Sequence, residues 1–317
     1  MIYTVTLNTA IDKIIEINGT ISRKKNNKIK SIEYDVGGKG THISILLSAL
    51  NIPNVATGII GSKNKKKLLN LLEKRNVICE FIEQENSSIR ESLILIDDTQ
   101  KGSIMITESG FIVERETLNK LNNYLQHRLS KDDFVVFSGS PPKSFPMEWY
   151  SSLIQTVMDK NAKLVMDVNG KILNEALIFS PYLIKPNEDE FLELIDKPLS
   201  NLNEYIEEIT RLLNKKIKIV AVSLGKKGSL IGYKDKIYKV SPPAINEIND
   251  TGCGDIFLGG LLAGIYQKLP IKESIQMATA LSATKAMQKN SSSFSITEAN
   301  NLKKFVEIQE FSISEVG

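Results

Sequence analysis

A chain of 317 residues, of which 42% are hydrophobic and 24% are charged, has the composition of a globular protein and the length of one large α/β domain or two medium ones. Its 40 basic and 37 acidic residues leave a formal net charge of +3, too small a bias to indicate nucleic acid or a membrane as a partner. With two cysteines and two histidines, the chain can form neither a disulfide framework nor a multi-histidine metal site, and it suits a reducing compartment.

The N-terminus does not resemble a signal peptide, because it lacks a basic head followed by an unbroken apolar run. The apolar stretch at residues 256–265 is about half the roughly 20 residues that a helix needs to cross a bilayer. We therefore expect a cytoplasmic protein.

Short apolar runs alternate along the chain with stretches whose apolar residues recur every three or four positions. The runs are typical of strands buried on both faces, and the stretches are typical of helices. We expect strands at residues 2–7, 56–60, 134–137, 163–167, 183–185 and 217–223, and helices at 42–50, 68–72, 118–129, 149–158 and 205–213. This repetition predicts an α/β fold, a doubly wound and mainly parallel sheet flanked by helices.

Two regions, residues 13–35 and 89–107, interrupt this rhythm with strand-like alternation and no helix. Turn residues divide each of them, namely Asn18, Gly19, Asp97, Asp98 and Gly102. We expect them to be antiparallel ribbons that form a small β lid over a ligand site, although an ordinary extension of a sheet edge explains the pattern equally well. Since we find no internal repeat or linker, we expect one domain over residues 1–317 with these two insertions.

Beyond residue 238 the pattern becomes mostly helical, with helices expected at 255–266, 271–288 and after Ser295. The first of these helices follows the sequence NDTGCGD at residues 249–255. Gly252 and Gly254 permit backbone conformations that direct successive N–H groups to one point, and a helix N-terminus adds partial positive charge there. This segment can therefore hold the charge of a phosphoryl group in transfer.

Asp255 is unexpected in that segment, because a carboxylate beside an anion site repels the anion. A functional interpretation is that Asp255 accepts the proton of an attacking hydroxyl group. A structural interpretation is that it satisfies free amides at the start of the helix. The segment alone does not separate the two.

Two further segments have both functional and structural interpretations. DVGGKG at residues 35–40 is a glycine-rich turn before a helix, and Lys39 is placed to meet an anion, but the spacing is not that of a Walker P-loop. IKPNEDE at residues 184–190 places Asn187 and Glu190 three apart, on one side of a first helical turn. Taken alone, this second pair is most simply a helix cap and its capping-box partner.

Six segments together carry a resemblance that none carries alone. They are LNTAID (7–12), GGKG (37–40), SGSPP (138–142), IKPNEDE (184–190), VSLGKKGS (222–229) and NDTGCGD (249–255). In this order, and nearly from end to end of the chain, they resemble the ribokinase-like (phosphofructokinase B) carbohydrate kinases, in particular the branch that contains 1-phosphofructokinase and tagatose-6-phosphate kinase.

The resemblance implies a catalytic centre in the last of these segments. By analogy with the family, Asp255 is the catalytic base, and the backbone amides of Gly252, Cys253 and Gly254 form the anion hole. Relatives usually have alanine where this chain has Cys253. Because backbone amides do the work, the change should be tolerated, although the thiol could be open to oxidation or alkylation.

The resemblance also implies a nucleotide and metal side. Asn187 and Glu190 match the motif that positions Mg²⁺ and its waters near the phosphates of ATP. The other residues implied on this side are Lys185, Ser223, Gly225, Gly228, Ala280 and Ser282.

On the acceptor side, the resemblance implies hydrogen bonds from Asp12 to sugar hydroxyls and a role for Arg90 in holding a phosphate that the acceptor already carries. The other implied residues are Gly38, Lys39, His42, Ser138 and Lys28. Many relatives have asparagine in place of His42 and arginine in place of Lys28. Lysine keeps the charge of arginine but loses its bidentate fork.

The implied reaction is transfer of the γ-phosphate of ATP to fructose 1-phosphate, giving fructose 1,6-bisphosphate. The alternative acceptor is tagatose 6-phosphate, which would give tagatose 1,6-bisphosphate. A catalytically inactive sugar-phosphate or nucleotide sensor is the alternative from another class. A dinucleotide-binding oxidoreductase is disfavoured, because the first strand is not followed by a G-x-G-x-x-G turn. The resemblance also suggests a homodimer formed through the β lid.

Overall fold

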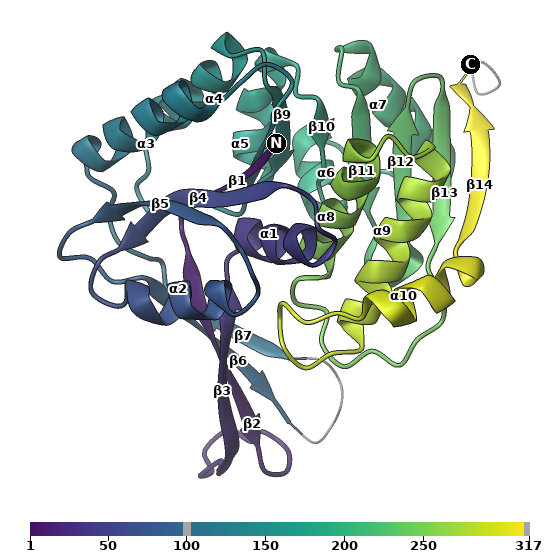
Figure 1. The fold of residues 1–317 in the computed structure, drawn as a ribbon. Coiled ribbons are helices and arrows are strands. Elements are labelled where there is room, and N and C mark those ends of the chain that lie inside the picture. The colour runs from purple at the N-terminus through teal and green to yellow at the C-terminus, as the bar shows by residue number, and fades with distance from the viewer. Residues whose placement is uncertain (98–102, 314–317) are drawn as a thin grey trace.

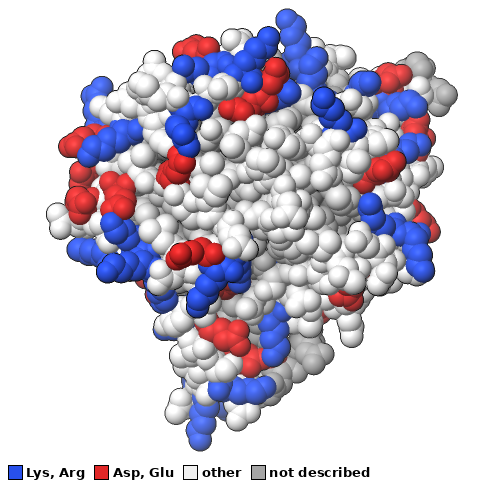
Figure 2. Space-filling view, in the orientation of Figure 1, with Lys and Arg blue, Asp and Glu red and all other residues white. Residues whose placement is uncertain are grey.

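The computed structural model describes residues 1–97 and 103–313. Figure 1 shows a large sheet with helices on both faces and a smaller sheet that projects away from it. This arrangement confirms the predicted α/β class. Figure 2 shows acidic and basic side chains interspersed over the visible face, in agreement with the small net charge.

The large sheet has the strand order β14-β13-β12-β11-β10-β9-β8-β1-β4-β5. All neighbouring strands from β5 to β11 are parallel, whereas β12, β13 and β14 pair antiparallel at the other end. The strands are β1 (Ile2–Thr6), β4 (Asn54–Gly61), β5 (Cys79–Gln84), β8 (Phe134–Ser138), β9 (Lys163–Asp167), β10 (Leu183–Ile184), β11 (Ile219–Ser223), β12 (Ser229–Tyr233), β13 (Lys236–Ser241) and β14 (Glu307–Ser312).

Helices cover the sheet in two layers, each with its own hydrophobic core. In β8, Val135 and Phe137 face the core beneath α3 to α7, whereas Phe134 and Val136 face the core beneath α1, α8 and α9. This alternation is the reason why the strand reads as one continuous apolar run. The helices are α1 (Lys39–Ala49), α2 (Lys65–Glu73), α3 (Arg115–Arg128), α4 (Met147–Asp159), α5 (Gly170–Ala176), α6 (Glu188–Ile195), α7 (Leu202–Asn214), α8 (Cys253–Tyr266), α9 (Ile271–Ala286) and α10 (Ile296–Leu302). None of the described helices is both long and apolar enough to span a membrane.

The small sheet has the order β3-β2-β6-β7. Its strands are β2 (Ala10–Ile17), β3 (Ile29–Gly37), β6 (Arg90–Ile96) and β7 (Ile104–Thr107). The β2/β3 and β6/β7 pairs are antiparallel, and the parallel pairing of β2 with β6 joins the two expected ribbons into one sheet. Residues 98–102, which include the expected turn residues Asp98 and Gly102, lie outside the described residues.

Four strands of the large sheet were not expected from the sequence, namely β5, β12, β13 and β14. β5 and β14 lie at the two ends of the sheet, and most of their residues are half-buried or exposed. Neither carries the continuous apolar run that indicates a strand covered on both faces. The prediction of a mostly helical C-terminal region is therefore right for α8, α9 and α10 but wrong for β14, which completes the sheet beside β13.

Candidate active site

A cavity of about 1670 Å³ opens at the carboxyl edge of the parallel strands. Ligands of open α/β sheets bind outside this edge. Pockets for single small molecules usually measure about 300–1,000 Å³, so this cavity has room for two ligands. Its walls come from the small sheet, the ends of β8 and β11, the loop before α8, and one face of α9.

The loop before α8 has the geometry that an anion site requires. Gly252 is the N-cap residue of α8 with a φ angle of 87°, and a Cβ atom there would lie 2.2 Å from the Ser291 carbonyl oxygen. Only glycine fits this position. The amide of Cys253 donates to Asp250 O at 3.1 Å, whereas the amides of Gly252 and Gly254 have no acceptor within the described part of the chain. Two of the three predicted amides are thus free for an anion.

Asp255 occupies the first turn of α8 and lines the cavity. Among the described residues its carboxylate has no hydrogen bond to a backbone amide, and the N-cap residue of α8 is Gly252. Instead, Asp255 Oδ2 lies 2.7 Å from His42 Nδ1, and both side chains are buried. The structural interpretation of Asp255 as a satisfied cap is therefore wrong.

His42 joins α1 to this centre through both of its ring nitrogens. Nε2 lies 2.8 Å from the Val36 carbonyl oxygen, opposite the contact of Nδ1 with Asp255. Burial alone would lower the pKa of His42, but the hydrogen bond to Asp255 and the charges of Asp255 and Asp12 raise it to about 9. The imidazole is therefore charged at neutral pH.

The thiol of Cys253 is less reactive than the sequence suggested. Burial raises its pKa to about 12, so the thiol stays protonated. Only the thiolate is a strong nucleophile. The structure thus argues against ready alkylation of Cys253, while its backbone keeps its place in the loop.

An ionic cluster lies at the ends of the central strands. Asp167, the last residue of β9, is fully buried, with Lys185 Nζ 2.9 Å and Lys39 Nζ 3.7 Å from its Oδ1 atom. The Ser138 hydroxyl donates to Asp167 Oδ2 at 2.8 Å. Burial raises the pKa of Asp167, but the two ammonium groups outweigh burial and lower it. Asp167 was missed in the sequence, although its position at the end of a buried strand is a usable signal.

Asn187 and Glu190 form a complete capping box at the start of α6. Asn187 Oδ1 accepts from the Glu190 amide at 2.8 Å, and Glu190 Oε2 accepts from the Asn187 amide at 2.9 Å. Both residues also line the cavity. Each keeps further oxygen lone pairs, and a few oxygen ligands supplemented by water suit Mg²⁺.

The other residues predicted on the nucleotide side divide into two groups. Ser223, Gly225 and Gly228 line the cavity beyond β11, and Ser282 lines it from α9, where its hydroxyl donates to Cys253 O at 2.9 Å. Ala280 does not line the cavity and is fully buried in the core. The face of α9 toward the cavity carries Thr279, Ser282, Ala283 and Ala286, whose helical spacing excludes position 280.

Asp12 and Arg90 lie on adjacent strands of the small sheet and line the cavity. Gly37 lets β3 pass Asp12 closely, since a Cβ atom there would lie 2.2 Å from Asp12 Oδ1. Ser291 donates a hydrogen bond to the other carboxylate oxygen, and burial raises the pKa of Asp12. Arg90 donates to the carbonyl oxygens of Asn8 and Glu108, each at 3.3 Å. It has no salt bridge to any described residue, so its charge is available to a ligand.

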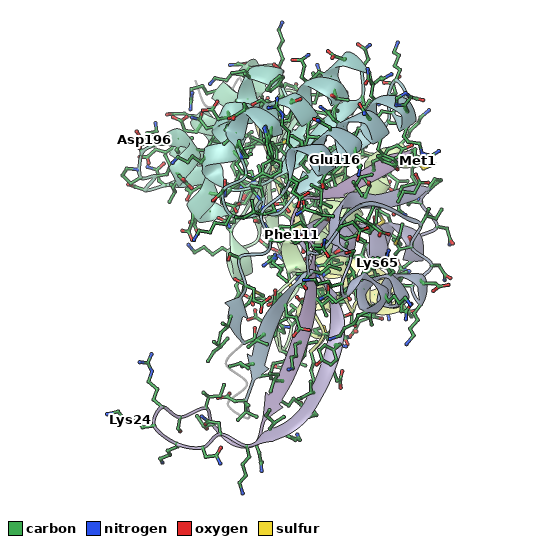
Figure 3. The ribbon with its side chains drawn as sticks, turned by 90° about the vertical axis from the view of Figure 1, so that its left-hand side faces the viewer. Met1, Lys24, Lys65, Phe111, Glu116 and Asp196 are labelled. Atoms are coloured by element: carbon green, nitrogen blue, oxygen red, sulfur yellow. The ribbon has the colours of Figure 1, made fainter. Side chains whose placement is uncertain are left out.

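Lys28 does not lie at the cavity. It is exposed in the segment between β2 and β3, beyond the cavity walls. Figure 3 shows Lys24, in the same segment, at the tip of the projecting sheet and away from the body of the molecule. The remaining predicted acceptor-side residues, Gly38, Lys39, His42 and Ser138, do line the cavity.

Sequence reasoning also missed Lys285. This lysine of α9 is fully buried and donates from Nζ to the Asn249 carbonyl oxygen at 3.0 Å, directly behind the loop of Gly252. Burial lowers the pKa of its ammonium group. The sequence could have indicated this lysine, because its neighbours in ATALSATKA are mostly small or apolar residues, which is unusual around a lysine on a solvated helix face.

Comparisons with known proteins show what this chain is similar to. A family model described as pfkB family carbohydrate kinase matches residues 5–298. The chain is 29% identical over 286 residues to 1-phosphofructokinase from Bacillus subtilis, covering 90% of this chain and 92% of the relative. It is 24% identical over 313 residues to tagatose-6-phosphate kinase from Staphylococcus epidermidis, covering 98% and 100%. Phosphofructokinase-2 from Escherichia coli in complex with substrates and products has the same fold, with a TM-score of 0.90 at 21% identity over 96% of this chain and 98% of that one.

Proposed function

The chain belongs to the pfkB family of carbohydrate kinases, and we propose that it transfers the γ-phosphate of ATP to fructose 1-phosphate, giving fructose 1,6-bisphosphate. One observation carries this proposal. The Asp255 carboxylate lines the cavity on the first turn of α8, directly after the free amides of Gly252 and Gly254. A proton acceptor is thus placed beside a binding site for the phosphoryl group, as in-line transfer to a hydroxyl requires.

In the proposed reaction, Asp255 accepts the proton of the acceptor hydroxyl as the hydroxyl oxygen forms a bond to the γ-phosphorus. The bond from that phosphorus to the bridging oxygen breaks, and its electron pair leaves with ADP. The free amides of Gly252 and Gly254 and the dipole of α8 stabilise the negative charge of the phosphoryl group. Lys185 and Lys39 add positive charge at the strand ends.

We assign the nucleotide to the side of the cavity formed by Ser223, Gly225, Gly228 and Ser282. Asn187 and Glu190, which also line the cavity, would hold Mg²⁺ largely through water. When bound, the metal would neutralise charge on the phosphates. Lys185 is assigned here as well.

The acceptor is assigned to the side formed by Asp12, Gly38 and the small sheet. Arg90 is proposed to hold the phosphate that the acceptor carries, because its guanidinium bonds only to carbonyl oxygens within the described residues and its planar fork matches phosphate oxygens. Asp12 is proposed to accept hydrogen bonds from sugar hydroxyls.

Tagatose 6-phosphate is the second candidate acceptor, and the named relative from Staphylococcus epidermidis favours it. ADP release should be measured with fructose 1-phosphate, tagatose 6-phosphate, fructose 6-phosphate and ribose. We expect the highest kcat/KM with fructose 1-phosphate. A higher kcat/KM with tagatose 6-phosphate would instead identify the protein as a tagatose-6-phosphate kinase. Binding of these sugars in calorimetry without any release of ADP would indicate a sensor.

We also propose that two copies of the chain dimerise through the face of the small sheet that points away from the cavity. Two cross-strand rows cover that face: Ile32, Ile15, Leu95 and Ile104, and Tyr34, Lys13, Leu93 and Ile106. The edge strands leave Ile32, Ile104 and Ile106 exposed. Lys13 is the charged residue within these two rows, and at one end of the face Lys67 lies over the Tyr34 ring and pairs with Glu91. A largely apolar face of this kind suits packing against its own copy about a two-fold axis. Since ATP and reduced thiols are typical of the cytoplasm, we propose that the reaction takes place there.

A further inference from the structure

His42 is held in a way that fixes its hydrogen atoms. The Val36 carbonyl oxygen can only accept, so the hydrogen of the 2.8 Å contact belongs to Nε2. A neutral ring with its hydrogen on Nε2 would turn a bare lone pair of Nδ1 toward Asp255 Oδ2. Because Nδ1 and Oδ2 are 2.7 Å apart, a hydrogen atom has to lie between them, since two facing lone pairs would repel. The imidazole and the carboxylate together therefore hold one proton more than a neutral histidine and an ionised aspartate.

The groups around His42 favour a positive charge on the ring. Carboxylates reach it from three other elements, Asp12 on β2, Asp35 on β3 and Asp255 on α8. Asp35 is already paired with Arg75, whose Nη2 lies 2.7 Å from Asp35 Oδ1. The cations that act on these carboxylates are Lys39 on α1, Arg90 on β6, Arg75 after α2 and Lys285 on α9.

We propose that His42 is a positioning residue that carries a proton in the resting enzyme, fixes Asp255 through Oδ2, and offsets the repulsion between Asp255 and the phosphates of ATP. This inference rests on the proposed kinase function. It resolves the difficulty that a carboxylate stands beside an anion site, because the Asp255–His42 pair has no net charge. A carboxylate without such a partner would weaken phosphate binding.

The same geometry excludes His42 as the group that takes the proton of the acceptor. Both ring nitrogens already carry hydrogens, one donated to Val36 and the other to Asp255. The proton of the acceptor hydroxyl therefore goes to the other oxygen of Asp255, Oδ1. His42 keeps its protons throughout while the bond to the γ-phosphorus forms and the bond to ADP breaks.

Two replacements separate the two hydrogen bonds of the ring. In His42→Asn the amide can reach Asp255 from the position of Nδ1, but it carries no charge. In His42→Gln the longer side chain can reach Val36 from the position of Nε2 and leaves Asp255 without its partner. His127→Gln is the matched control, because His127 is exposed on α3 and its hydrogen bond among the described residues is to the carbonyl oxygen of Asn123, at 2.7 Å.

The first test compares the pH dependence of kcat/KM for ATP. In the wild type, kcat/KM should fall as the pH rises through about 9, where His42 loses its proton. His42→Asn should lack this alkaline limb and should show a roughly tenfold lower kcat/KM at neutral pH, the difference between a charged and a neutral hydrogen bond. His42→Gln should lose more activity than His42→Asn, and His127→Gln should match the wild type. An alkaline limb that persists unchanged in His42→Asn would overturn the inference.

The second test does not depend on turnover. The chain has two histidines, so the ¹⁵N resonances of His42 can be assigned by comparison with His127→Gln. We expect both ring nitrogens of His42 to be protonated at neutral pH. A neutral ring in an enzyme that phosphorylates sugar phosphates would overturn this role alone. A wild type that phosphorylates no member of the acceptor panel would overturn the proposed function, and the role of His42 with it.

Discussion

The Ser291 hydroxyl donates a hydrogen bond to the Asp12 carboxylate, although the two residues are 279 positions apart in the chain. The next residue, Ser292, donates to Asp35 at 2.8 Å, so the loop after α9 is tied to both β2 and β3 of the small sheet. The loop after α9 also lies against the loop before α8, because the Ser291 carbonyl oxygen is so close to Gly252 that it leaves no room for a side chain there. The acceptor side and the phosphoryl side of the cavity are thus fixed to one another.

Ser291→Ala tests this connection. Asp12 would lose its hydroxyl partner, and a buried polar group without a partner costs about 1–3 kcal/mol. We expect KM for fructose 1-phosphate to rise about tenfold while KM for ATP changes little. Steady-state kinetics with each substrate varied in turn provide the measurement. An equal rise of KM for both substrates would indicate that the loop supports the whole cavity rather than Asp12.

Arg90→Ala should mainly weaken binding of the phosphorylated acceptor. Loss of a charge-assisted contact to phosphate predicts a KM for the acceptor that is at least roughly tenfold higher, with KM for ATP nearly unchanged. Lys28→Ala is the matched control, because Lys28 is exposed and outside the cavity. If Arg90→Ala weakened ATP binding alone, the assignment of the two sides of the cavity would be reversed.

Lys285→Met tests whether the buried ammonium group of Lys285 supports the loop before α8. The apolar side chain has a similar length but cannot donate to Asn249 O, so we expect kcat to fall at least about tenfold and the free energy of unfolding to fall by about 1–3 kcal/mol. Lys272→Met is the control, since Lys272 lies on the same helix but binds Glu310 at the surface. Denaturant titration and kinetics should be measured on both variants. An unchanged kcat in Lys285→Met would show that the loop does not need this lysine.

The stability of the protein should depend on the charge of His42. Its pKa rises from 6.5 to about 9 on folding, so the folded state binds the proton more tightly than the unfolded state. The resulting stabilisation is complete below about pH 6.5 and is lost as the pH rises through about 9. For this buried group the shift corresponds to roughly 3 kcal/mol. The free energy of unfolding, measured with urea, should therefore differ between wild type and His42→Gln by an amount that shrinks as the pH rises over this range. A difference that does not change with pH would contradict a charged His42 in the folded state.

Ile106→Glu tests the proposed dimer. The substitution places a charge in the exposed apolar face of the small sheet, and we expect sedimentation velocity to show a monomer where the wild type is a dimer. Ile178→Glu is the control, because Ile178 is 77% exposed and lies outside the small sheet. A wild type that is monomeric at assay concentrations, or a dimer that survives Ile106→Glu, would contradict this interface.

The sequence predicted those parts of the fold whose signal is local. Strands such as β1, β8 and β11 are buried on both faces, and a continuous apolar run is enough to find them. β5 and β14 lie at the ends of the sheet, where partial exposure leaves no such run. The position of β14 depends on pairing with β13 across the helical C-terminal region, which no local pattern encodes.

The same distinction applies to the site. The anion-binding loop at Gly252 was predictable, because two closely spaced glycines directly before a helix indicate such a loop in the sequence itself. The partners of its residues were not, since His42 meets Asp255 across 213 positions and Lys185 meets Asp167 between separate strands. The resemblance placed Ala280 near the nucleotide, but helical phase turns it into the core, and a difference of one or two positions decides which side chains reach the cavity.

The most direct test of the account compares wild type with Asp255→Asn in two measurements, ADP release with fructose 1-phosphate and calorimetric binding of ATP. Asparagine keeps the shape of the side chain but cannot accept the proton of the acceptor, so we predict that kcat falls by at least about 100-fold, the usual effect of losing a general base. Binding of ATP should be nearly unchanged. Turnover by Asp255→Asn within a few fold of the wild-type rate would contradict the assignment of Asp255 as the base of this kinase.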